Sequence, residues 1–165
     1  MGLFQPDGRS RRLFRRAALS DDAPVIVIHS LAHAEAALSA AAAAGRPVLL
    51  ASARDAGVAA GPGWFGALVA AARAAVPAAH FTAWLDCGDD AGAAQAAIRA
   101  GVEGIVFTGR ADVAARLTDI AAQQGARLIT ARPHPALDLA ADFFAAPETL
   151  RRRCADVLAS AAAIC

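Results

Sequence analysis

Ionisable side chains gather directly after an apolar segment in the middle of the chain. Residues 80–85 are mostly apolar, and Asp86, Cys87, Asp89 and Asp90 follow them. In a parallel α/β sheet, ligands bind at the carboxyl ends of the strands. If residues 80–85 form a central strand, Asp86 stands where it could act as a general acid or base. Cys87, next to the start of a helix, could have a lowered pKa and act as a nucleophile, with a buried, inert thiol as the alternative.

Arginines follow three other apolar segments of the chain. Arg54, Arg110 and Arg132 each come one or two residues after a segment that we predict to be a strand. Guanidinium groups bind phosphate and carboxylate bidentately, so these arginines predict an anion site at the same edge of the sheet. The alternative is that each arginine pairs with a nearby carboxylate, for instance Arg54 with Asp55 or Asp86. The other side chains that we expect to contact the ligand at this edge are Ser52, Asp89 and Thr108.

Imidazole, thiolate and carboxylate side chains at the same edge could also hold a metal ion. Zinc accepts all three ligand types, and His29 and Cys87 both follow predicted strands. We therefore name His29 and Cys87 as the metal ligands if a divalent metal such as zinc is bound. For Asp89 or Asp90 the alternative is a helix cap, because a carboxylate at a helix N-terminus accepts backbone hydrogen bonds. The sequence points to no other cofactor.

The elements that must position these side chains alternate regularly along the chain. Short apolar runs are typical of strands buried on both faces of a parallel sheet, and the segments between them have helical length and glycine stops. This alternation predicts an α/β fold with about five parallel strands and right-handed crossovers, as half of a TIM barrel or as a flavodoxin-like three-layer sheet. The predicted strands are residues 25–28, 47–52, 80–85, 104–108 and 127–131, and the predicted helices are residues 31–44, 64–75, 91–100, 111–124 and 147–163.

Length and composition narrow the class of protein. A chain of 165 residues predicts one domain, which we assign to residues 24–165, after a basic arm of residues 1–23 that contains five arginines. All sixteen basic residues are arginines, so Schiff-base catalysis and the Walker A lysine are excluded. Three cysteines are too few for a disulfide framework, which favours the reducing cytoplasm.

Hydropathy and charge bear on the partners of the protein. The mean hydropathy of +0.41 comes mostly from alanine, and the longest uncharged run, residues 56–72, contains four glycines and a proline, so we expect no membrane span. The net charge of +1 gives no reason to expect nucleic acid. Alanine-rich helix faces bury little area each, which favours a homo-oligomer that covers the helices or the sheet edges.

Several short motifs within residues 30–110 resemble the first half of the class II, metal-dependent fructose-bisphosphate aldolases, which are TIM barrels. They include Trp84-Leu85-Asp86-Cys87-Gly88, where the family has Leu-Asp-His-Gly, and Ala97-Ile98-Arg99-Ala100-Gly101 before residues 104–109. The resemblance implies that Asp86 exchanges a proton with the substrate and that position 87, a metal-binding histidine in the family, contacts zinc. The family's later strands, which supply its other metal and phosphate contacts, have no counterpart in 165 residues.

These observations give two hypotheses of different kinds. The first is a diverged aldolase-like domain that binds a small anionic metabolite, phosphorylated or carboxylated, at the carboxyl ends of the strands. If it retains activity, it is a carbon–carbon lyase that uses Asp86 and Cys87. The alternative is a non-catalytic scaffold or protein-interaction module that self-assembles.

Overall fold

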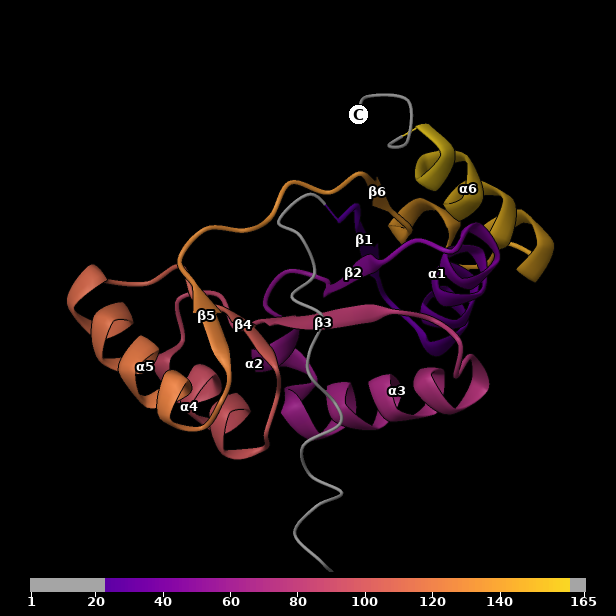
Figure 1. Cartoon of the computed structure of the whole chain (residues 1–165). Helices are drawn as coiled ribbons and strands as arrows, with labels where there is room; N and C mark the ends of the chain where they lie inside the picture. Colours follow the sequence, from indigo (N-terminus) through magenta and orange to yellow (C-terminus); the bar gives the residue numbers. More distant parts are fainter. Residues whose placement is uncertain (1–22, 161–165) are drawn as a thin grey trace, which may run out of the picture.

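The computed structural model describes residues 23–160, which form one sheet of six parallel strands alternating with helices (Figure 1). This confirms the predicted α/β architecture. The predicted basic arm lies outside the described residues, except for Ala23. The elements are β1 (Val25–Ile28), α1 (Leu31–Ala44), β2 (Val48–Ser52), α2 (Ala56–Ala59), α3 (Gly61–Ala75), β3 (Phe81–Asp86), α4 (Ala91–Arg99), β4 (Gly104–Val106), α5 (Ala111–Gln123), β5 (Arg127–Ile129), β6 (Leu137–Asp138), a 3-10 turn (Ala140–Asp142) and α6 (Pro147–Ser160).

The strands lie side by side in the order β5-β4-β3-β2-β1-β6. The first five strands are therefore consecutive neighbours, whereas the order typical of flavodoxin is 2-1-3-4-5. The sixth strand, which the sequence did not predict, pairs in parallel with the free side of β1. Right-handed crossovers that all advance in one direction place their helices on one face of the sheet.

The side chains of the strands separate into two faces, as the alternation along a strand requires. One set, which includes Ile26, Leu50, Leu85 and Ile105, forms a single core with the apolar side chains of the helices. The helices α6, α1, α3, α4 and α5 pack against one another in that order and follow the outside of the sheet in Figure 1. We call the helix-free face of the sheet the inner face. Its buried apolar side chains, which lie outside this core, are Val25, Ala51, Trp84 and Val106.

A long connection joins the two edge strands of the sheet. Residues 130–136, which we call the strap, run from the end of β5 to the start of β6 (Figure 1). A flat sheet of six strands would separate these edges by about 24 Å. The eight residue steps from Ile129 to Leu137 reach at most about 28 Å when fully extended. A connection of this length could therefore just span a flat sheet, and curvature of the sheet toward the strap would bring the two edges closer.

Helix ends fix the strand ends that carry the site. Ser30 is the N-cap of α1, and its side chain accepts a hydrogen bond from the backbone N–H of His33. Asp90 begins α4 in the same way, because its Oδ1 accepts the N–H of Ala93 at 2.8 Å. The helix-cap alternative is therefore confirmed for Asp90. Among residues 23–160, no helix is both long and apolar enough to cross a membrane.

Candidate functional site

A pocket with a volume of about 460 Å³ opens between the inner face of the sheet and the strap, at the carboxyl ends of the strands. We call it the rim pocket. Apolar side chains of the strands line its sheet side, and the strap contributes the opposite wall. Polar and charged side chains stand around both. Its lining residues are Val27, His29, Ala51, Ser52, Ala53, Arg54, Trp84, Asp86, Val106, Arg132, Pro133, Pro135 and Asp138.

Asp86 at the end of β3 holds the strap against the sheet. Its Oδ2 accepts a hydrogen bond from Arg132 Nε at 2.5 Å, and its Oδ1 accepts one from Arg132 Nη2 at 3.1 Å. The same Oδ1 accepts the backbone N–H groups of Asp55 at 3.1 Å and Gly88 at 2.9 Å. The side chain of Asp86 is 7% exposed, so this charge is compensated inside the protein. Asp86 is thus engaged on both oxygens as an acceptor.

Arg132 is correspondingly fixed as a cation. The hydrogen bond with Asp86 raises the pKa of Arg132, and the charges of Asp86 and Asp55 act in the same direction. Its Nη2 also lies 3.3 Å from Asp55 Oδ1, and its side chain is 29% exposed. The guanidinium group therefore neutralises Asp86, and its Nε and Nη2 donors are engaged by carboxylates. Local pairing, the alternative for the arginines, applies to Arg132.

Two tight turns support this pair. Gly88 has a φ of +57°, and a Cβ at this position would lie 2.2 Å from Asp55 Oδ1. Asp55 also has a φ of +57°, and no other non-glycine residue in the described part of the chain has a positive φ. Left-handed backbone is uncommon outside glycine, although aspartate tolerates it better than most residues. The two turns bring the N–H groups of both residues onto one carboxylate.

Arg54 is the cation of the rim pocket that remains available. It follows β2, is exposed and lines the pocket, and no carboxylate of residues 23–160 forms an ion pair with it. Ser52 also lines the pocket, where its Oγ accepts the backbone N–H of Asp86 at 2.9 Å. The structure therefore brings together Ser52, Arg54, Asp86 and Arg132 from the predicted catalytic and ligand-binding residues, and the predicted metal ligand His29 lies in the same pocket.

Three other predicted ligand contacts lie outside the rim pocket. Arg110 is 81% exposed and donates to both carboxylate oxygens of Asp112 at 3.0 Å. Asp89 is exposed, and Thr108 is half-buried with its backbone N–H bound to the carbonyl of Gly88. The three arginines therefore do not converge on one point, because one of them pairs within its own helix turn and another pairs with Asp86.

Cys87 lies on the helix-facing side of the sheet. Its side chain is fully buried in the core, and a Cβ on Gly57 would meet its Sγ at 2.6 Å. Burial, followed by the charge of Asp86, raises the pKa of the Cys87 thiol to about 12. A thiol with this pKa stays protonated near neutral pH and is a poor nucleophile and a poor metal ligand. We therefore leave Cys87 out of the site.

His29 lies in the rim pocket, but on the opposite side of the sheet from Cys87. Its Nε2 pairs with Asp138 Oδ1 at 2.7 Å. Partial burial alone would raise the pKa of Asp138, but the hydrogen bonds from His29 and from the N–H of Ala140 lower it overall. Within residues 23–160, no three His, Cys, Asp or Glu side chains are grouped as metal ligands. The predicted pair of metal ligands is thus not assembled.

Sequence reasoning missed the contribution of β6 and of the strap prolines. Asp138, Pro133 and Pro135 line the rim pocket, yet they belong to a segment with no strand or helix pattern. A strand of two residues leaves too short an alternation of apolar and polar side chains to be recognised. The only available signal was the pair of prolines, which favour an extended backbone.

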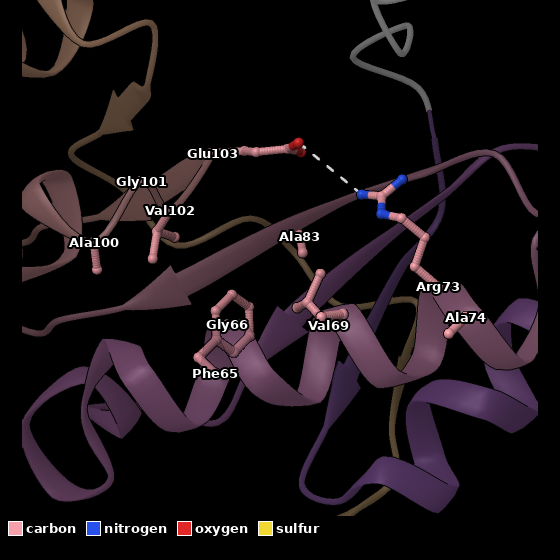
Figure 2. Close-up of a pocket in the computed structure, with 11 residues that line it drawn as sticks. Phe65, Gly66, Val69, Arg73, Ala74, Ala83, Ala100, Gly101, Val102 and Glu103 are labelled. Carbon is pink, nitrogen blue, oxygen red and sulfur yellow. Dashed lines mark ion pairs between the residues drawn. The ribbon is translucent and has the colours of Figure 1, made fainter. Parts of the chain in front are cut away.

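A second hollow lies in the helix layer. It has a volume of about 550 Å³ and separates α3 from the segment that leads into β4, as Figure 2 shows. Phe65, Val69 and Val102 give it an apolar lining, and the guanidinium of Arg73 lies 4.0 Å from the carboxylate of Glu103 at its edge. Its two charged side chains therefore face each other.

No protein-family model matches the chain, and no curated protein matches it. The class of the protein is therefore defined by its fold and its site alone. It is a parallel α/β domain whose strand order is consecutive from β1 to β5, with a pocket at the carboxyl ends of its strands.

Proposed function

We propose that the protein binds a small organic anion in the rim pocket. The observation that carries this proposal is an arginine without an ion pair in the described chain, Arg54, beside a cavity of about 460 Å³. Cavities of 300 to 1,000 Å³ are typical of small-molecule sites. A guanidinium group at the edge of such a cavity offers two parallel N–H donors to a carboxylate or phosphate. The position at the carboxyl ends of parallel strands is where α/β proteins bind their ligands.

We propose binding in preference to carbon–carbon cleavage. A general base needs a carboxylate that can reach the substrate proton, whereas Asp86 already accepts hydrogen bonds on both oxygens and neutralises Arg132. The consecutive strand order and the motif around Asp86 support a diverged relative of the class II aldolases. In such a relative, the residue that exchanges protons in the family would instead position the strap.

Ligand-induced stabilisation tests the binding proposal. Pyruvate, benzoate, dihydroxyacetone phosphate and inorganic phosphate would be added to the full chain, and the melting temperature recorded. A ligand at 100 times its Kd stabilises by about 2.7 kcal/mol, or about 5–10 °C in Tm for a domain of this size. Arg54→Ala should abolish the shift, while the matched variant Arg110→Ala should retain it. The absence of a shift with every anion, or a shift that Arg54→Ala leaves intact, would refute the proposal.

Self-assembly is a second candidate function, favoured by an exposed aromatic pair. Phe144 is 95% exposed, and its ring lies 5.0 Å from that of Phe143 in an edge-to-face arrangement. Exposed aromatic side chains are enriched at protein interfaces. If a second copy of the chain covers this pair, light scattering should give a molar mass above that of one chain, and Phe144→Ser should reduce it. A monomer at all concentrations would exclude this candidate.

A further inference from the structure

The charges around the rim pocket restrict the anion that it can accept. Of its two arginines, Arg132 is neutralised by Asp86, so Arg54 alone is available. Two carboxylates, Asp86 and Asp138, also line the pocket and are paired with Arg132 and His29. A phosphate dianion would bring two negative charges toward these carboxylates with one guanidinium to compensate them. A monovalent carboxylate matches a single guanidinium in both charge and fork geometry.

The sheet side of the pocket is apolar. Val27, Ala51, Trp84 and Val106 come from four neighbouring strands and share the inner face. The indole of Trp84 packs over β4, where Gly104 leaves room for it: a Cβ on Gly104 would lie 2.7 Å from the ring. An aromatic ring and three aliphatic side chains offer contact area but almost no hydrogen bonds. This surface suits a hydrocarbon or aromatic group.

The strap side of the pocket lacks backbone donors at two positions. Pro133 and Pro135 both line the cavity, and proline has no N–H. Phosphate sites usually present several N–H groups to the ligand oxygens. Here two of the strap residues that line the cavity are instead prolines. Apolar side chains of the sheet and the prolines of the strap thus line the same pocket as Arg54.

We infer that the ligand of the rim pocket is a monovalent carboxylate that carries an apolar body, with the carboxylate on Arg54 and the body between Trp84 and the prolines of the strap. This inference rests on the proposed function and specifies its ligand class. It favours branched-chain or aryl carboxylates over sugar phosphates and other phosphorylated metabolites. Arg54 provides the charge recognition, and the apolar walls provide the selectivity among carboxylates.

The two tryptophans make the inference directly testable by fluorescence. Trp84 lines the rim pocket, whereas Trp64 on α3 lies outside it and is 40% exposed. In the full chain carrying Trp64→Phe, Trp84 is therefore the only indole reporter. Titrations would use 3-phenylpropanoate, acetate and inorganic phosphate at constant ionic strength. We expect 3-phenylpropanoate to change the Trp84 emission and to bind at least about tenfold more tightly than acetate, because it buries more apolar area.

Two variants separate the charge from the apolar walls. Arg54→Ala should weaken 3-phenylpropanoate binding by about tenfold or more. Val27→Thr keeps the shape of the side chain but adds a hydroxyl to the apolar wall, so it should weaken 3-phenylpropanoate several-fold and leave acetate unchanged. The matched control is Val69→Thr, which should change neither affinity. Val69 is half-buried and lines the second hollow, shown in Figure 2.

Each outcome bears on a different statement. Phosphate binding as tight as that of 3-phenylpropanoate, or equal affinities for acetate and 3-phenylpropanoate, would overturn the inferred ligand class while anion binding itself stands. If none of the three anions binds, and calorimetry without the fluorescent reporter agrees, the proposed function fails together with the inference. Tight binding of 3-phenylpropanoate that depends on both Arg54 and Val27 would support both.

Discussion

The ion pair between Asp86 and Arg132 should contribute both to the stability of the domain and to the order of the strap. Asp86→Asn keeps the size of the side chain and an oxygen for the N–H groups of Asp55 and Gly88, but it removes the charge that faces Arg132. Removing one partner of a fully buried ion pair costs about 3–5 kcal/mol. Since the Arg132 side chain is 29% exposed, solvent screens part of this loss. We expect Asp86→Asn to lower the free energy of unfolding by about 2 kcal/mol.

Arg132→Ala should cost less, about 1 kcal/mol, because two backbone N–H groups still donate to Asp86 when the guanidinium is absent. Urea unfolding at pH 7, followed by circular dichroism, measures both values. In a double-mutant cycle the two residues should couple by about 1 kcal/mol. Amide exchange within residues 130–136 should accelerate in both variants, since the pair connects the strap to β3.

Arg110 supplies the matched control for these measurements. Its ion pair with Asp112 is exposed and local, so Arg110→Ala should change the stability by less than about 0.5 kcal/mol. The reasoning is refuted if Asp86→Asn costs no more than Arg110→Ala, or if the cycle shows no coupling. Unchanged amide exchange in the strap would show that Arg132 does not hold it.

Three further predictions concern the packing and titration of buried groups. Gly104→Ala places a Cβ 2.7 Å from the Trp84 ring and should lower the free energy of unfolding in urea by about 1–3 kcal/mol. The control Gly66→Ala, in an open helix position, should raise it by about 0.5 kcal/mol. Equal effects of the two substitutions would contradict the close packing of the indole. Burial, aided by a neighbouring imidazole, lowers the pKa of His33 below 6.5. The contribution of His33 to stability is therefore complete above pH 6.5 and is lost as the pH falls from there through the folded-state pKa. The free energy of unfolding should change by at most about 1.4 kcal/mol per pH unit in this range, and His33→Gln should remove this dependence. Cys87, with the other cysteines replaced by alanine, should resist iodoacetamide at pH 8 in the native state and react in urea; rapid native labelling would mean that the end of β3 opens.

Strand periodicity explains which predicted site residues belong to the rim pocket and which do not. The alternation of elements predicted the parallel sheet and the edge at which Asp86 and Arg132 meet. Cys87 follows Asp86 directly, and consecutive side chains of an extended chain point to opposite faces, so the two residues could not both line one pocket. The alternation of side chains between the two faces could therefore be derived from the sequence, whereas position at a strand end alone does not separate Asp86 from Cys87.

The loops limited the prediction of the remaining contacts. Arg54 and Arg110 each come two residues after a predicted strand, yet one lines the pocket and the other pairs with Asp112. Their directions depend on backbone torsions such as the positive φ of Asp55, which no local pattern specified. The pairing of β6 with β1 depends on a contact across the whole domain, which a reading of neighbouring residues could not supply.

The pairing of β6 with β1 has a consequence for the order in which the domain assembles. His29 and Asp138, which join these strands, are 109 residues apart, and closing a loop of that length costs about 4 kcal/mol in chain entropy, against about 3 kcal/mol for neighbouring βα units. The difference corresponds to roughly a tenfold slower step, so we expect the five consecutive units to form first and the seam to close last. Until then, β6 and α6 remain the portion that two chains could exchange, and domain swapping through this C-terminal segment is the expected misassembly of the protein.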